Sequence, residues 1–205
     1  RSTAATRVNA DGNIEKQTGN FILHSQDIDN SYWNKYNMSV TANQAVAPDG
    51  TTTADLIDDG TATGNHAIEE KETIGFGGAV TISIHAQYID TQYLVLAIYD
   101  TGYRAVAFDI QNGTIGNKSL STLIPTIEDL GSGWYRCSVT HPSNTRNDPF
   151  FAFGLRDDNV AGLFSSAGTN RQAYVWGAQL EDGLVATDYI ETTTTALYGG
   201  ITDNV

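Results

Sequence analysis

The stretch Thr81-Ile82-Ser83-Ile84-His85-Ala86-Gln87 alternates polar and apolar side chains from its first residue to its last. Successive side chains of an extended strand point to opposite faces of its sheet, so Ile82, Ile84 and Ala86 share one face and the polar side chains share the other. This alternation predicts a strand of an antiparallel sheet, with one face on the core and one polar face.

Strand-like runs of the same kind surround this stretch, and Gly, Asn, Asp or Pro residues separate them. About ten strands without an internal repeat predict an all-β fold, a two-sheet antiparallel jelly-roll β-sandwich of the concanavalin A-like or carbohydrate-binding-module-like type. The runs cover residues 21–24, 38–42, 52–57 and 66–70 before the stretch, and 93–99, 105–110, 134–140, 150–156 and 173–181 after it.

The domain organisation follows from composition along the chain. Of the 205 residues, 40% are hydrophobic and 10% aromatic, which suffices for one sandwich core. Residues 1–20 are polar and aperiodic and predict an extended N-terminal arm or linker, residues 21–190 the sandwich, and residues 191–205 a C-terminal extension. The first residues include neither an initiator Met nor an apolar signal core, as expected of a fragment or a processed product.

Charge and hydropathy argue against nucleic acids and membranes as partners, and the cysteine content excludes an intrachain disulfide. The 24 acidic and 11 basic side chains give a net charge of −13, which repels the phosphates of nucleic acids and of anionic membranes. The longest apolar runs are too short for membrane insertion. Cys137 has no partner for an intrachain disulfide.

The sequence lacks the specific catalytic motifs, so we expect a binding protein and not an enzyme. It contains no glycine-rich phosphate loop, no HExxH, no paired cysteines and no Gly-x-Ser-x-Gly elbow. Its carboxylates occur as sequence neighbours, which point to opposite faces of a strand and cannot flank a glycosidic bond.

Alternation also assigns faces in three later strands. Trp134, Arg136 and Ser138 are expected to point away from the core, as are Gly177 and Gln179. The residues predicted to face the core are Tyr135, Cys137, Val139, Phe151, Phe153, Leu155, Tyr174, Trp176, Ala178 and Leu180.

If these strands share one sheet, their outward side chains form a shallow polar groove floored by Ala152, Gly154 and Gly177. Sugars offer hydroxyl groups to planar donors and acceptors and C–H faces to aromatic rings, which Trp134, Tyr99 or Tyr103 would supply. An ordinary solvated sheet face would show the same alternation, and this alternative stays open. The candidate glycan ligands are His85, Gln87, Tyr99, Trp134, Arg136, Arg156 and Gln179.

A structural calcium ion is the cofactor that the loops suggest, because Asp and Asn side chains offer hard oxygen ligands. Asp157, Asp158 and Asn159 form one such cluster, and Asp27, Asp29 and Asn30 form another. The same residues are common in plain turns, which is the more frequent explanation. The four histidines are scattered without metal-site spacing, so zinc is not expected.

Several stretches resemble a known family. One is Asn30-Ser31-Tyr32-Trp33-Asn34-Lys35 followed by residues 47–55, a second spans residues 127–139, and the third is Tyr174-Val175-Trp176-Gly177-Ala178-Gln179-Leu180-Glu181, continuing through 186–190. Together they resemble the carbohydrate-binding-module-like jelly-roll domain of phage head-spike and tail-fibre proteins. The resemblance covers nearly the whole chain and implies architecture and binding, while the groove residues come from the face assignment alone.

The resemblance implies a non-catalytic bacteriophage domain on the virion surface, outside the cell, that attaches to host cell-surface polysaccharide. Other virion proteins would be its neighbours, and many weak sites on one particle would act together. Two alternatives stay open. One is a structural decoration or homo-oligomerisation domain of a virion fibre, and the other is a binding module of a secreted polysaccharide-degrading enzyme.

Overall fold

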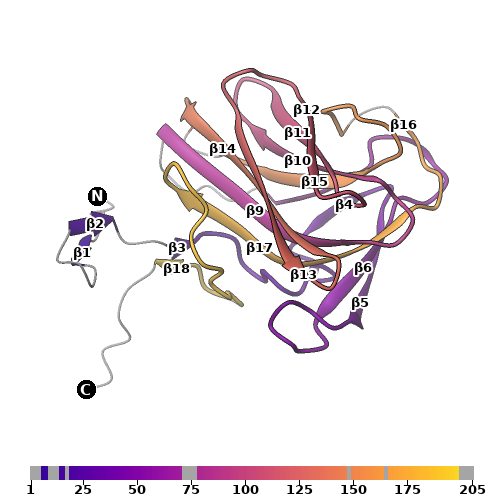
Figure 1. Ribbon diagram of the computed structural model, residues 1–205, viewed down its shortest axis with the longest axis horizontal. Helices are drawn as coiled ribbons and strands as arrows, with labels where there is room; N and C mark the ends of the chain where they lie inside the picture. Colours follow the sequence, from indigo (N-terminus) through magenta and orange to yellow (C-terminus); the bar gives the residue numbers. More distant parts are fainter. Residues whose placement is uncertain are drawn as a thin grey trace.

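Two antiparallel sheets of six strands each form the body of the protein (Figure 1). The computed structural model describes residues 6–8, 14–16, 19–70, 78–146, 149–163 and 166–198. These residues form strands, turns and irregular loops and include no helix, so none of them forms a helix that could span a membrane. The predicted all-β, two-sheet jelly-roll sandwich is confirmed.

The first sheet, named the β10 sheet, has the strand order β12-β11-β10-β15-β8-β4. The second, named the β9 sheet, has the order β13-β14-β9-β17-β6-β5. The strands of the β10 sheet are β12 (Thr114–Lys118), β11 (Tyr103–Asp109), β10 (Tyr93–Tyr99), β15 (Phe151–Arg156), β8 (Ala67–Glu70) and β4 (Asn34–Tyr36). Those of the β9 sheet are β13 (Ile124–Gly131), β14 (Trp134–Asn144), β9 (Gly78–Tyr88), β17 (Gln172–Asp182), β6 (Ala54–Asp58) and β5 (Ser39–Ala45).

Three short antiparallel pairs accompany the two sheets. In the predicted N-terminal arm, β1 (Thr6–Val8) pairs with β2 (Ile14–Lys16), and the remaining residues of 1–18 lie outside the described residues. β7 (Thr63–Gly64) pairs with β16 (Ser166–Ala167). β3 (Gly19–Asn20) pairs with β18 (Leu197–Tyr198), so segments from the two ends of the chain lie side by side (Figure 1).

The hydrophobic core lies between the two sheets. Ile82, Ile84 and Ala86 of β9 are fully buried in it, as the alternation of this strand predicted. From the other sheet, Phe151 and Phe153 pack edge-on against the ring of Trp33, which closes one part of the core. The predicted inward positions in β14 and β15 are confirmed, with Cys137, Val139, Phe151, Phe153 and Leu155 buried and Tyr135 packed against the same cluster.

A β-bulge in β17 reverses the predicted faces of its first half. The register of β17 against β9 shifts between Trp176 and Gln179, and Gly177 within the shift has a φ of +64°. An extra residue on one strand moves all following side chains to the other face. The prediction that Tyr174 and Trp176 face the core is therefore wrong. Ala173 and Val175 face the core before the bulge, while Ala178 and Leu180 face it afterwards.

The end of the chain returns over the β9 sheet as a segment named the C-terminal strap, residues 184–193. Asn20 fastens it, since its side-chain amide donates to the carbonyls of Ala178 and Ile190, both at 2.9 Å. Glu181 is 2% exposed and accepts hydrogen bonds from the main chain and the hydroxyl of Thr187. The strap is thus tied to β17 on the side of the sheet that faces away from the core.

Candidate functional site

The outer face of the β9 sheet collects five of the seven predicted ligand residues. β14, β9 and β17 are neighbours in this sheet, with Arg136 opposite His85 and Trp134 opposite Gln87. Gln179 lies opposite Ser83 on the far side of β9. The premise of a shared sheet is correct for these three strands.

The premise is wrong for β15 and β10, which belong to the other sheet. Arg156 and Tyr99 therefore lie away from the other candidates. Arg156 donates from its Nε to Asp158 at 2.6 Å, and Tyr99 stacks on Phe150, with the Arg146 guanidinium 4.9 Å from its ring centre. The predicted floor residues Ala152 and Gly154 are in β15 too. Alternation determines which face of a strand is buried but does not determine which sheet the strand joins.

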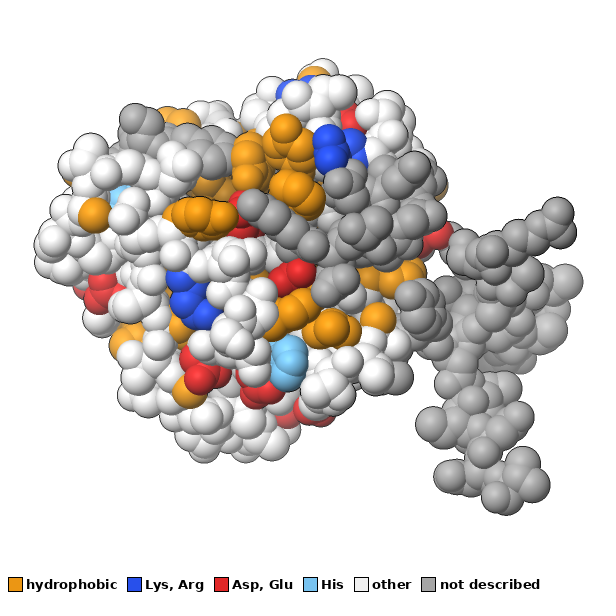
Figure 2. All heavy atoms as spheres, turned by 180° about the vertical axis from the view of Figure 1, so that it is seen from behind, with side chains coloured by type: hydrophobic (Ala, Val, Ile, Leu, Met, Phe, Trp, Pro, Cys, Tyr) orange, Lys and Arg blue, Asp and Glu red, His pale blue; other side chains and the backbone are white. Residues whose placement is uncertain are grey.

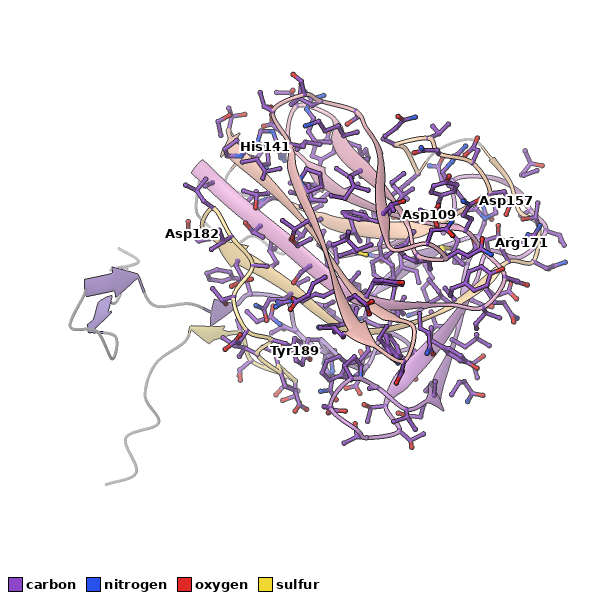
Figure 3. The ribbon with its side chains drawn as sticks, in the orientation of Figure 1. Asp109, His141, Asp157, Arg171, Asp182 and Tyr189 are labelled. Atoms are coloured by element: carbon purple, nitrogen blue, oxygen red, sulfur yellow. The ribbon has the colours of Figure 1, made fainter. Side chains whose placement is uncertain are left out.

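The C-terminal strap covers His85 and Gln179. Gln179 is fully buried, donates to the carbonyl of Asp188 at 3.2 Å and accepts from the main-chain N–H of Ile190 at 2.7 Å. His85 is 4% exposed and packs against Trp176 and Tyr189, the latter labelled in Figure 3. Burial, together with the nearby Arg136 charge, lowers the pKa of His85 to about 4. Both side chains are occupied in holding the strap and are closed to a ligand in this arrangement.

Trp134 points outward as predicted, yet it is only 4% exposed. It packs in a cluster with Ala47, Ala54 and Trp176, and its indole N–H donates to the carbonyl of Val46 at 3.1 Å. A sugar cannot stack on a ring that is covered in this way. Trp134 instead supports a loop at the edge of the open surface.

The described residues form two open hollows on this face, and the first is named the Gln87 hollow. Its volume is about 550 Å³, and its lining includes Val46, Pro48, Gln87, Leu130, Ser132 and Trp134. Val46 and Leu130 are exposed, so this hollow has an apolar rim. The Gln87 amide donates to the carbonyl of Ser132 at 2.7 Å, which fixes the amide plane within the hollow.

The second is named the Arg136 hollow and has a volume of about 200 Å³. Its polar lining comes from two neighbouring strands and consists of Thr126, Glu128, Arg136, Ser138 and Thr140. Its apolar lining is Ile124 of β13 together with Leu184, Val185 and Ala186 of the strap. Alternate side chains of β14 thus reach both hollows, because Trp134 lines the first and Arg136, Ser138 and Thr140 line the second.

Arg136 is the partly buried cation of this face. One of its terminal nitrogens donates to the Ser83 hydroxyl at 3.1 Å, while its buried Nε has no hydrogen-bond partner among the described residues. Burial lowers the pKa of the guanidinium, and the carboxylates of Glu181, Glu128 and Asp188 act in the opposite direction. The guanidinium stays charged under these conditions, so its buried Nε–H is a cationic donor that lacks an acceptor.

The calcium candidates point to separate protein partners. Asp157 accepts from Thr169 Oγ1 at 2.8 Å and pairs with Arg171, beside which it lies in Figure 3. Asp158 holds Arg156, and Asn159 accepts from the main-chain N–H of Asn117. Within the described ranges, no group of three or more His, Cys, Asp or Glu side chains is placed to hold a metal ion.

In the second predicted calcium loop, a lysine takes the place that a cation would occupy. The Lys35 ammonium donates to the carbonyls of Asp29, Asn30 and Trp33 at 3.1, 2.7 and 3.1 Å. Burial lowers its pKa, while the carboxylates of Asp29 and Asp55 raise it. Three converging carbonyl oxygens beside carboxylates form a cation site, and here the chain supplies its own cation.

Replacing Lys35 by methionine is expected to lower the free energy of unfolding by about 1–2 kcal/mol, because three carbonyls lose their common donor at a partly exposed site. Chemical denaturation followed by tryptophan fluorescence measures this change. Gln44→Met, an exposed replacement by the same residue, should stay within about 0.5 kcal/mol of the original chain. Equal midpoints for Lys35→Met and the original chain would contradict the role of this ammonium.

Sequence reasoning missed Glu128 and Thr126, although a signal for both exists. The segment Asp129-Leu130-Gly131-Ser132-Gly133 is rich in turn residues, and Gly131, Ser132 and Gly133 all have positive φ. A tight hairpin at this point pairs residues 124–131 with the strand that begins at Trp134. The turn signal therefore predicts the hairpin, but counting back from it would place Asp129 opposite Arg136, and the bulge between Asp129 and Gly131 brings Glu128 there instead.

The Gln87 hollow and the Arg136 hollow are together named the trough, because residues of β14 line both. The fold and this open face define a jelly-roll β-sandwich with a candidate ligand-binding trough. The solved structures similar to it include the following two. One is the enzymatically active domain of tailspike protein 4 of bacteriophage CBA120, with a TM-score of 0.43 and 10% identity over 81% of this chain and 21% of that chain. The other is the CBM22-1–GH10 modules of Clostridium thermocellum endo-1,4-β-D-xylanase 10B complexed with xylohexaose, with a TM-score of 0.43 and 10% identity over 84% of this chain and 30% of that chain. No family model matches the sequence, and no curated protein does.

Proposed function

We propose that this chain is a non-catalytic binding domain that holds polysaccharide in the trough along β14. The observation that supports this most directly is the pair of open hollows lined by alternate residues of one strand. Residues on one face of a strand repeat about every 6.6 Å, so the span from Trp134 to Thr140 is roughly 20 Å. A short run of linked sugars fits such a length.

The lining suits sugar chemistry. Thr126 and Ser138, whose hydroxyls hydrogen-bond each other at 2.6 Å, line the Arg136 hollow together with the Arg136 guanidinium, while Ile124 and Leu184 offer apolar surface. Sugars combine hydroxyl groups with C–H faces, and shallow sites of mixed polarity bind them weakly. Many copies on one particle would convert weak single sites into firm attachment.

A non-catalytic role agrees with the carboxylates of the trough. Glycoside hydrolysis requires two carboxyl groups on either side of the scissile bond. Glu128 is the carboxylate among the lining residues of the Arg136 hollow, and the Gln87 hollow has none within the described part of the chain. The nearby Glu181 is buried and bonded to Thr187.

We further propose placement on the surface of a phage virion, in a head spike or tail fibre, with host cell-surface polysaccharide as the ligand. The sequence resemblance of residues 127–139 and 174–181 supports this placement. In that setting, other virion proteins would be the neighbours of the domain.

A glycan array probed with the protein tethered in many copies tests the binding function. The expected result is retention on at least one polysaccharide-derived glycan, lost in Thr126→Trp, where an indole on the exposed Thr126 would fill the Arg136 hollow. The matched control is Thr61→Trp, at an exposed turn remote in sequence from the trough, which should retain binding. Retention on no glycan by the original chain would refute the proposal.

A structural decoration or oligomerisation role is the second candidate, and one observation favours it. Val185, Leu184 and Ile124 are 68%, 57% and 49% exposed, and all three line the same hollow. Grouped exposed apolar side chains are common at protein contacts. Light scattering after size exclusion distinguishes the roles, since a stable oligomer that Val185→Asp dissociates would support the structural one.

A further inference from the structure

The Arg136 hollow contains a cation and a carboxylate that face each other across two strands. Glu128 of β13 and Arg136 of β14 are direct partners in the register. Directly opposed side chains of an antiparallel pair share a face, with their Cβ atoms about 5 Å apart. Within the described structure, the hydrogen bond that Arg136 donates goes to Ser83 and not to Glu128.

We propose that this pair recognises a neutral polysaccharide through two neighbouring hydroxyl groups of one sugar. One hydroxyl oxygen accepts from the Arg136 guanidinium, and the other hydroxyl donates to the Glu128 carboxylate. A hydroxyl group can do either, and bonds to charged partners are the stronger kind. The inference rests on the proposed carbohydrate-binding function and names its ligand class.

The position of Arg136 supports this assignment. Its side chain lines the open hollow, and its one hydrogen bond among the described residues goes to the Ser83 hydroxyl, so the protein leaves most of the donor capacity of this cation unused. The apolar lining residues Ile124, Leu184 and Val185 would contact the C–H face of the same sugar. The hollow thus offers a charged donor, a charged acceptor and an apolar wall within one small volume.

The surrounding charge favours a neutral ligand over an acidic one. Glu128, Glu181 and Asp188 all act on Arg136, so its single positive charge is already opposed by three carboxylates. The net charge of the chain is −13, and acidic side chains are spread over the face seen in Figure 2. A uronate would meet repulsion at close range that a hydroxyl would not.

Affinity electrophoresis of the full chain tests the ligand class. The probes are gels containing the neutral polysaccharides glucomannan, laminarin or galactan, and gels containing the acidic alginate or polygalacturonate. Retardation is expected in at least one neutral gel and in neither acidic gel. It should change little with added NaCl, because hydrogen bonds to an uncharged sugar are weakly screened.

The residue assignment is tested with Arg136→Gln and Glu128→Gln, which keep size and polarity but remove one charge each. Each is expected to weaken retention by about tenfold or more. Arg156→Gln is the control, since Arg156 belongs to the other sheet and should leave retention unchanged. Denaturation midpoints of all three variants establish that they fold.

The outcomes separate this inference from the function on which it rests. Retardation in acidic gels that salt abolishes would overturn the neutral class while leaving carbohydrate binding in place. Neutral retention unchanged in both folded trough variants would overturn the role of Arg136 and Glu128. Retardation of the original chain in none of the gels would overturn the proposed function and this inference together.

Discussion

Asn20→Ala is expected to lower the free energy of unfolding by about 3–5 kcal/mol, because the substitution leaves several buried main-chain groups without partners. Asn20 is fully buried and uses both halves of its amide. The nitrogen donates to Ala178 and Ile190, and the oxygen accepts from the main-chain N–H groups of Ile22 and Leu180, both at 3.1 Å. An amide has two donors and one oxygen with two lone pairs, so no capacity remains unused.

These four bonds join segments that are far apart in the chain. Ile22 follows β3, Ala178 and Leu180 lie in β17 just beyond the bulge, and Ile190 belongs to the C-terminal strap. The substitution should therefore loosen the strap as well as its attachment to β17. Because Leu184 and Val185 of the strap form one wall of the Arg136 hollow, carbohydrate retention should fall in the same variant.

Urea denaturation followed by the fluorescence of the three tryptophans measures the stability change. Asn34→Ala is the matched control, since Asn34 is exposed and its loss should cost no more than about 0.5 kcal/mol. An Asn20→Ala midpoint close to that of the control would show that water replaces the amide at no cost. This outcome would contradict the role of Asn20 in holding the C-terminal strap to β17.

The fold was predictable because alternation is a local signal. β9, β14 and β15 each show a two-residue period, and the core residues Ile82, Phe153 and Val139 follow directly from it. The edge strands β12 and β13 are mostly exposed and lack a continuous apolar face, so their sequences show little period. Residues 21–24 look like a strand but bond to Leu180 and Thr193 and bend between them.

The site was only partly predictable because it depends on pairing between distant segments. Gln87 and Arg136 were placed correctly on one open face, but the sheet membership of Arg156 is set by strand order. The covering of His85, Gln179 and Trp134 is set by a strap and a loop that have no periodicity of their own. The direction in which a strand side chain points can therefore be predicted from the local sequence. Its exposure to solvent cannot, because distant segments of the chain can cover it.

The bulge at Gly177 made the prediction from alternation wrong for the first half of β17. Replacing this glycine is the second change for which we expect a large effect. Gly177→Ala is expected to lower the free energy of unfolding by about 2–4 kcal/mol, combining the strain of a left-handed conformation with overpacking. Its φ is +64°, and an added Cβ would lie 2.9 Å from Nδ1 of His85 and 3.2 Å from a ring carbon of Tyr189. Gly162→Ala is the control, since an added Cβ there meets nothing within 4 Å.

A double-mutant cycle with His85→Ala separates the two causes. If the clash dominates, Gly177→Ala should cost less in the His85→Ala background, because the imidazole that it meets is gone. If backbone strain dominates, the cost should be the same in both backgrounds, at roughly 1–2 kcal/mol. A Gly177→Ala variant as stable as Gly162→Ala would contradict both causes and would mean that β17 pairs with β9 without a left-handed residue at this position. The same cycle reports on the trough, because the bulge directs Gln179 and Glu181 toward the strap that forms its apolar wall.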